Sequence, residues 1–201
     1  VNNQETDRLR VSADVDERPL REIYLAAFEH VVRTTQPWTV MCSYNRINGV
    51  YASQDPWLLA DVLRDQWGFE GLVVSDWGAV DDPVAAVAAG LDLEMPSTGG
   101  LSAARITAAV RAGQLYEAVL DVAVARVLRL VERAGAGQAA PVEVDADAHH
   151  ELARSVAADC VVLLKDDDDL LPVQLDEGTI AVIGAFAEHP RFQGAGSSKV
   201  N

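Results

Sequence analysis

An apolar run that stops abruptly at a carboxylate is the first feature of this sequence that could do chemistry. Leu72, Val73 and Val74 follow one another without polar alternation, as in a strand covered on both faces of a parallel sheet. Asp76 then stands at the carboxyl end of that strand, where α/β proteins bind ligands and present catalytic side chains. A nucleophile or ligand is expected there, but Asp also favours helix N-caps, and its position alone leaves both interpretations open.

The surrounding pattern predicts strands and helices in alternation. Apolar residues at three- and four-residue spacing favour helices, and short apolar runs favour strands. The expected helices span 16–36, 55–67, 83–89, 101–112 and 116–134, the strands 38–42, 72–74 and 91–95, and the loops 1–14 and 43–53. This order is typical of right-handed parallel units in an α/β fold. Three strands cannot close a barrel, so only the later part of one would be present.

The composition changes after residue 134. Residues 135–147 are rich in Gly, Ala, Pro and acidic side chains without periodicity, which indicates a linker. A helix is then expected over 149–159, strands over 160–164 and 179–184, and a flexible loop over 194–198. We therefore divide the chain into a first domain at 1–134, a linker at 135–147 and the beginning of a second α/β domain at 148–201, which looks cut short.

Charge and length exclude several kinds of partner. The 201 residues carry a net charge of −15, which repels phosphate backbones and anionic lipid, so neither nucleic acid nor a membrane is expected as a partner. No apolar run approaches the ~20 residues that span a bilayer. The chain begins with Val rather than Met, so we expect the true N-terminus to be missing, and a cytoplasmic or a secreted location both remain open.

No cofactor or metal is expected. The acidic run 166–169 is interpreted as a solvated turn, and the adjacent His149 and His150 cannot share a helix face. The loop 194–198 lacks the Lys-Ser or Lys-Thr ending of a phosphate-binding loop. Cys42 and Cys160 lie in apolar runs, where free buried thiols are the usual case, and no disulfide framework is implied.

Several motifs stand in a specific order along the whole chain. They are Asn2-Asn3-Gln4-Glu5 with Arg8, the run from Val40 to Gly49, Ser75-Asp76-Trp77 after Gly-Leu-Val-Val, Val161 to Lys165, Leu170-Leu171-Pro172, and Val182-Ile183-Gly184. This set resembles glycoside hydrolase family 3 and is most similar to its β-glucosidase branch. The resemblance implies the later part of a (β/α)8 TIM-type barrel, followed by the start of a second α/β sandwich domain.

The resemblance also implies an activity. It points to a retaining exo-acting β-glycosidase that hydrolyses terminal non-reducing β-D-glucosyl residues of a β-glucoside or oligosaccharide. Asp76 would be the nucleophile that forms a covalent glycosyl-aspartate, with a second carboxylic acid about 5 Å away as acid and base. Trp77 would wall the pocket of the terminal sugar. Met41 and Tyr44 would line it, with the Tyr44 hydroxyl able to reach the nucleophile.

Each of these residues also has an ordinary structural interpretation. Trp77 could belong to the core, Met41 could fill a gap in it, and Tyr44 could be a surface aromatic. Arg8 follows the position of the family's Lys-His sugar-binding pair, which the chain lacks because it starts too late. Arg8 could contact the pocket or pair with Glu5, and we favour the ion pair.

The resemblance places the acid/base Glu beyond residue 201 and the first half of the barrel before residue 1. Because general acid catalysis typically contributes 10²- to 10⁴-fold, we expect the isolated chain to have little or no activity. Within the family, a β-xylosidase or another exo-β-glycosidase is the alternative. Outside it, a receiver-type phospho-acceptor domain lacks its acidic metal-binding pair, whereas a non-catalytic α/β interaction module is not excluded.

Overall fold

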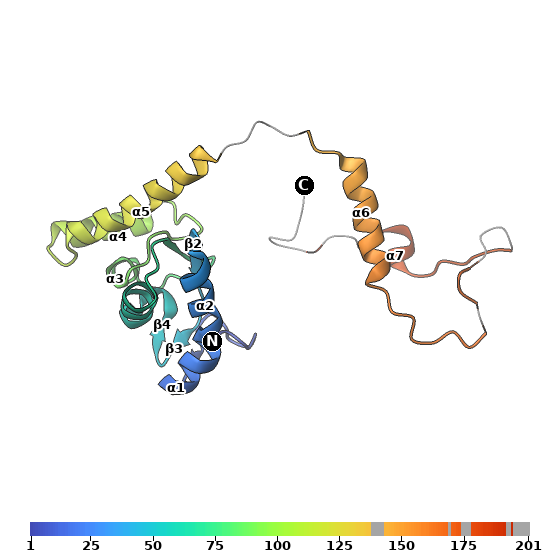
Figure 1. Ribbon diagram of the computed structural model, residues 1–201, viewed down its shortest axis with the longest axis horizontal. Helices are drawn as coiled ribbons and strands as arrows, with labels where there is room; N and C mark the ends of the chain where they lie inside the picture. Colours follow the sequence, from blue (N-terminus) through green and yellow to red (C-terminus); the bar gives the residue numbers. More distant parts are fainter. Residues whose placement is uncertain (138–142, 169, 174–177, 192–193, 195–201) are drawn as a thin grey trace. The chain divides into compact units, whose positions relative to one another are not determined.

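The chain forms two compact units in the computed structural model, Val1–Ala140 and Pro141–Asn201 (Figure 1). The structure describes residues 1–137, 143–168, 170–173, 178–191 and 194. The boundary between the units falls inside the proposed linker at 135–147. Helix α5 (Glu117–Ala136) and helix α6 (Ala146–Asp159) both extend into that range, so the helices are longer than the sequence pattern indicated.

The helix expected over 16–36 is present as one helical run. It consists of α1 (Glu17–Pro19), the π-helical η1 (Leu20–Leu25) and α2 (Ala26–Thr35). Leu20, Leu25 and Val32 are buried on its inner face, whereas Ile23, Phe28 and Val31, which have the same apolar character, are exposed. Gln36 ends the run in the left-handed conformation, with φ of 46°. The next expected helix, 55–67, is the π-helical η3 (Trp57–Gln66).

Two parallel strands form the centre of the first unit. β2 (Thr39–Cys42) pairs with β5 (Leu72–Ser75) in a register that places Met41 beside Val74 and Cys42 beside Ser75. β5 is buried as predicted, but β2 is largely exposed, because no strand covers its other edge in the part of the chain that the structure describes. The residues that follow both strands meet at one edge of the sheet.

The prediction of irregular loops at 1–14 and 43–53 is wrong in part. β3 (Arg46–Ile47) and β4 (Val50–Tyr51) form a hairpin, β1 (Ser12–Ala13) pairs parallel with β3, and a 3₁₀ turn, η2 (Ala52–Gln54), follows. The turn residues Asn48 and Gly49 both have positive φ, which is the geometry of a two-residue hairpin. The Asn48 amide also binds the main chain of Val15 in both directions, at 2.7 and 3.0 Å. This long-range anchor has no local sequence signal.

The predicted strand at 91–95 is also wrong. Only Leu93 forms a bridge, parallel to Val74, because the Asp92 carboxylate takes the place of a main-chain acceptor for the Val73 amide. The predicted helices around this segment are confirmed as α3 (Pro83–Ala89), α4 (Leu101–Arg111) and α5. Segment 91–95 therefore lies beside β5 without forming a regular ladder of main-chain hydrogen bonds.

The second unit contains α6 and the short α7 (Ala185–Glu188). The strands predicted at 160–164 and 179–184 are not formed, and Leu164 and Ile183 are 90% and 91% exposed. A strand needs a hydrogen-bonded neighbour, and the described residues of this unit provide none. Cys160 is exposed, contrary to expectation, for the same reason. Of the expected loop at 194–198, only Gly194 lies within the described residues.

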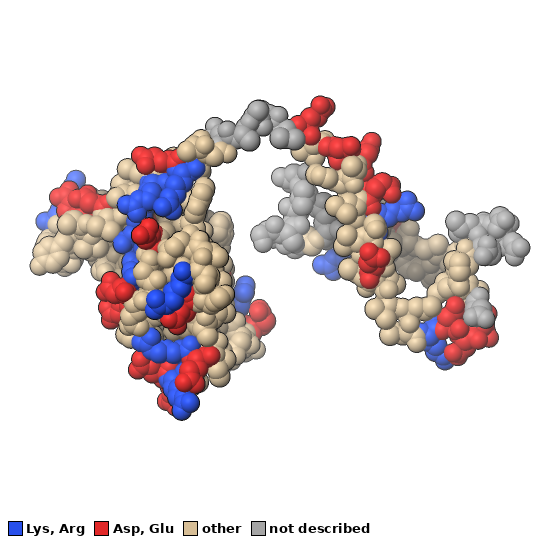
Figure 2. Space-filling model, in the orientation of Figure 1, with Lys and Arg blue, Asp and Glu red and all other residues tan. Residues whose placement is uncertain are grey.

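The surface of the first unit mixes both signs of charge. On the face shown in Figure 2, acidic and basic side chains alternate over the helices without forming one continuous basic area. Among the described helices, none is both long and apolar enough to cross a membrane. Within the same described residues, no group of three or more His, Cys, Asp or Glu side chains converges as a metal site would require.

Candidate active site

Asp76 lies directly after β5, at the carboxyl edge of the two-stranded sheet, and its side chain is half-buried. One carboxylate oxygen, Oδ1, accepts a hydrogen bond of 2.7 Å from the Trp77 amide. The following helix, α3, is capped by a different residue, because Asp82 Oδ1 accepts from the Val84 amide at 3.0 Å. The helix-cap interpretation of Asp76 therefore fails, which leaves its carboxylate for another role.

Tyr44 reaches the same edge from the end of β2. Burial raises the pKa of its phenol, and a hydrogen bond to Asp76 and the negative charge of Asp76 raise it further. A phenol with a raised pKa stays protonated at neutral pH and so remains a hydrogen-bond donor. The Tyr44 hydroxyl can therefore orient the Asp76 carboxylate and stabilise its negative charge.

Arg8 joins this group from the N-terminal segment. Its guanidinium carbon lies 4.9 Å from the centre of the Tyr44 ring, in a cation–π arrangement. The expected ion pair with Glu5 is also present, with Arg8 Nε 3.6 Å from Glu5 Oε2. Arg8 thus contacts Tyr44 and pairs with Glu5 at the same time, and its positive charge partly offsets the effect of Asp76 on the pKa of Tyr44.

Trp77 and Met41 are both exposed. Their exposed fractions are 59% and 53%, so neither side chain packs in the core of the described residues. An exposed tryptophan beside a carboxylate offers a flat apolar surface and a polar rim, which suits an amphipathic ligand. The structure therefore brings Arg8, Tyr44 and Asp76 into contact, with Trp77 and Met41 uncovered nearby.

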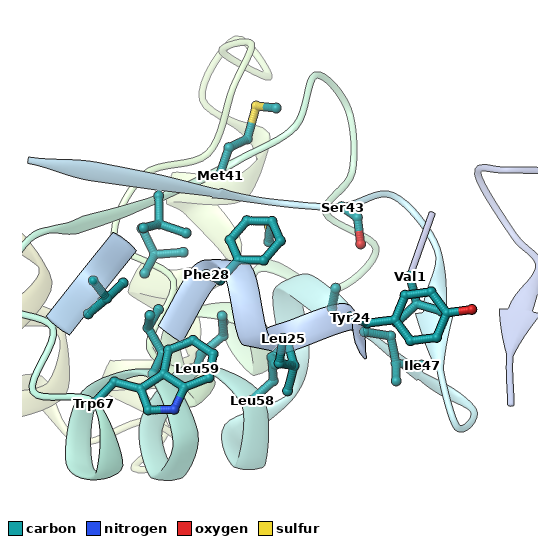
Figure 3. A pocket seen from close by; sticks show the side chains of 16 residues that line it. Val1, Tyr24, Leu25, Phe28, Met41, Ser43, Ile47, Leu58, Leu59 and Trp67 are labelled. Atoms are coloured by element: carbon teal, nitrogen blue, oxygen red, sulfur yellow. The ribbon is translucent and has the colours of Figure 1, made fainter. Parts of the chain in front are cut away.

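A separate apolar cavity of about 120 Å³ lies between the first helix and β2. Figure 3 shows Tyr24, Leu25 and Phe28 facing this space, whereas the Met41 side chain points away from it. Its lining is overwhelmingly apolar, with few groups able to hydrogen-bond a polar ligand. This cavity is packing space between helix and sheet, distinct from the carboxyl edge where Asp76 lies.

Two further residues at this edge were not singled out by their spacing. Cys42 is paired with Ser75, and burial raises the pKa of its thiol to about 11, so it stays protonated beside Asp76 and is a poor competing nucleophile. Ser75 is completely buried, and its hydroxyl binds both the N–H and the C=O of Met95, at 2.8 and 3.2 Å. The parallel register, which only the structure gives, is the signal that places both beside the carboxylate.

A parallel β-α arrangement with a carboxylate, a tyrosine and an arginine at its carboxyl edge is typical of an α/β protein with a polar site. The family model described as the glycosyl hydrolase family 3 N terminal domain matches residues 4–130. The chain belongs to this family. The resemblance found in the sequence and the barrel-type fold class are thereby confirmed.

Individual relatives agree with this assignment. The chain is 50% identical, over its whole length, to the "Thermostable beta-glucosidase B" of Acetivibrio thermocellus and to an "Exo-alpha-(1->6)-L-arabinopyranosidase" of Bifidobacterium longum, covering 26% and 27% of those proteins. A solved GH3 β-glucosidase of Bifidobacterium adolescentis superimposes with a TM-score of 0.74 at 53% identity, over 96% of this chain and 28% of that one. The chain therefore spans about a quarter of the length of these relatives.

β-Glucosidase 3B of Thermotoga neapolitana, solved in complex with glucose, is a further structural match. It superimposes with a TM-score of 0.63 at 47% identity, over 65% of this chain and 19% of that chain. Together these matches cover both the segment that carries Arg8, Tyr44 and Asp76 and, for most of the relatives, the second unit.

Proposed function

We propose that this chain carries the nucleophile of a retaining exo-β-glycosidase of the β-glucosidase type. The observation that carries the proposal is the placement of Asp76 at the carboxyl edge of β5, close enough to Tyr44 for its carboxylate to raise the pKa of the phenol, in a member of glycosyl hydrolase family 3. A carboxylate that is half-exposed, held by a neutral donor and free of helix capping suits attack on an anomeric carbon.

The reaction has two displacements. An Asp76 carboxylate oxygen bonds to the anomeric carbon while the glycosidic C–O bond breaks, and a second carboxylic acid protonates the leaving oxygen. The same group then removes a proton from water, whose oxygen displaces Asp76 and releases the sugar. We propose that this second group is supplied from outside residues 1–201, since the chain spans only about a quarter of its relatives. Residues 1–201 alone would then have little activity.

The neighbouring side chains have separate roles in this proposal. The exposed face of Trp77 stacks on the terminal sugar, Met41 lines its pocket, and Tyr44 orients the nucleophile. Arg8 holds the Tyr44 ring by stacking on it, and its charge is shared with Glu5. The carbohydrate itself is the partner that these groups recognise.

The sugar is proposed as a terminal β-D-glucosyl residue, because several relatives are named β-glucosidases and one was solved with glucose. A pentose is the second candidate, as in an exo-acting pentosidase of the same family such as a β-xylosidase. An exo-arabinopyranosidase matches the chain at the same 50% identity as a β-glucosidase. Sequence identity over this quarter of the relatives' length therefore does not distinguish a glucosyl from a pentosyl substrate.

The test uses the protein expressed from its full coding sequence and a 2-deoxy-2-fluoro-β-glucoside with a good leaving group. We expect the covalent sugar on the peptide that contains Asp76, identified by mass spectrometry, and loss of turnover in Asp76→Ala. Asp81→Ala, which removes an exposed carboxylate five residues away, is the matched control and should keep its activity. A trapped sugar on another residue, or an active Asp76→Ala variant, would refute the proposal.

A further inference from the structure

Segment 91–95 is attached to β5 by both main-chain and side-chain hydrogen bonds. The Asp92 and Leu93 amides both bind the Val73 carbonyl at 3.1 Å, and the Ser75 amide binds the Leu93 carbonyl at 2.9 Å. Side chains supply the remaining bonds: the Asp92 carboxylate accepts from the Val73 amide at 2.8 Å, and Ser75 binds Met95. The segment therefore depends on two particular side chains in addition to its backbone.

The Ser75 hydroxyl is placed where it controls the turn that carries the nucleophile. It accepts from the Met95 amide at 2.8 Å and donates to the Met95 carbonyl at 3.2 Å. The same carbonyl accepts from the Gly78 amide at 2.8 Å. Both sides of Asp76, at positions 75 and 78, are thus tied to one residue, Met95. The Ser75 side chain is completely buried, so water cannot replace its bonds.

The opposite end of the segment is held by a buried ion cluster. Asp92 has no exposed side-chain surface and lies 2.6 Å from Arg64 and 2.9 Å from Arg126. Arg64 also donates to the Gly71 carbonyl, at the start of β5. Asp92 fixes the segment at Val73, three residues before Asp76, and so helps to set the position of Met95 relative to β5. Ser75 then binds Met95 and thereby fixes the 75–78 turn that carries Asp76.

We propose that Ser75 is a positioning residue for Asp76, acting through the Met95 main chain. The proposal rests on Asp76 being the nucleophile. Without the Ser75 hydroxyl, the partly buried Met95 amide loses its partner and the 75–78 turn keeps only one of its two ties. The carboxylate then departs from the line of attack, and a displacement near 1 Å can cost about 10²-fold in rate. The surfaces that bind the sugar, including Trp77, do not depend on this bond.

The test compares variants of the protein expressed from its full coding sequence on an aryl β-glucoside. In Ser75→Ala we expect kcat to fall at least about tenfold and KM to change less than about threefold, with an equal slowing of covalent trapping on Asp76. Val62→Ala removes methyl groups from an equally buried position in η3 and serves as the control for lost stability. Its kcat should stay within about twofold of the unaltered protein.

Further variants separate the possible failures. If Ser75→Ala does not fold, Ser75→Cys keeps the volume and weakens both hydrogen bonds, and the same fall in kcat at constant KM is expected. An unchanged kcat, or a fall no larger than in Val62→Ala, would overturn the positioning role. Asp76→Ala, assayed beside them, tests the nucleophile itself. If Asp76→Ala is inactive and Ser75→Ala is normal, only the positioning role fails, whereas an active Asp76→Ala removes the proposed function.

Discussion

A carboxylate nucleophile must stay ionised while the groups around it stay neutral or positive. Around Asp76, the Tyr44 phenol and the Cys42 thiol both have raised pKa values and remain protonated, and Arg8 is the nearby cation. The sequence motif predicted Asp76 and Tyr44 at this site. The sequence also predicted Cys42 as a buried free thiol, but not its position beside Asp76, because the two residues approach each other only through the pairing of β2 with β5.

Removing the Tyr44 hydroxyl should slow the proposed reaction. In Tyr44→Phe, Asp76 loses a donor to its charge, and a hydrogen bond to a charged group contributes about 1.5–3 kcal/mol, equivalent to roughly 10- to 100-fold in kcat/KM. Tyr51→Phe is the matched control, because the Tyr51 hydroxyl binds Arg46, at 3.2 Å, in the hairpin. Steady-state kinetics of both variants would show the difference, and equal rates in both would argue against a role for Tyr44.

The two cysteines should differ sharply in reactivity. Cys160 is exposed and should react with iodoacetamide at pH 8, whereas Cys42 is buried with its pKa raised to about 11 and should react only after denaturation. Because the unfolded thiol titrates near 9, its contribution to stability is complete below pH 9 and is lost as the pH rises through about 11. Peptide mapping after labelling checks this, and rapid labelling of Cys42 in native protein would contradict it.

Local signals determined most elements of the first unit, and side-chain anchors determined the rest. The helices at 16–36 and 83–89 follow from apolar spacing and from caps such as Asp82. The hairpin at 46–51 contains an Asn48-Gly49 turn signal that the loop prediction for 43–53 did not use, and the pairing with residues 12–13 depends on contacts over 30 residues apart. Segment 91–95 has the pattern of a strand, and its irregular attachment depends on Asp92.

The Asp92 cluster should be essential to the stability of the first unit. Asp92→Asn keeps the shape but leaves Arg64 and Arg126 beside a neutral partner, and breaking a buried pair typically costs about 3–5 kcal/mol. All four tryptophans lie in the first unit, so urea unfolding followed by their fluorescence reports on it. Its midpoint should fall strongly.

The control for this variant is Asp82→Asn. Asp82 pairs with Arg105 at the surface, and Asn caps a helix about as well as Asp, so this change should cost less than about 1 kcal/mol. If both variants unfold at the same urea concentration, the buried cluster does not hold segment 91–95 in the way described above.

At the scale of the whole molecule, the order of the motifs predicted the family correctly. The sequence did not predict that the apolar runs of the second unit form no strands. The apolar runs at 160–164 and 179–184 have the composition of buried strands, yet the described residues offer them no neighbouring strand. Composition predicts which surface a segment could bury, and only its partners decide whether it does. β2, with one uncovered edge, shows the same dependence in the first unit.

Catalysis, like strand formation, is expected to depend on parts of the protein outside residues 1–201. We therefore predict that residues 1–201 alone hydrolyse 4-nitrophenyl β-glucoside poorly. The chain spans 26% of the length of a β-glucosidase to which it is 50% identical, and we propose that the general acid is supplied from outside it. Loss of that acid alone costs about 10²- to 10⁴-fold, so kcat/KM should be at least about a hundredfold below that of the protein expressed from its full coding sequence.

The same chain with Asp76→Ala, purified identically, measures contaminating host enzyme. Turnover by residues 1–201 that matches the longer protein and disappears in Asp76→Ala would show that both catalytic groups lie within these 201 residues.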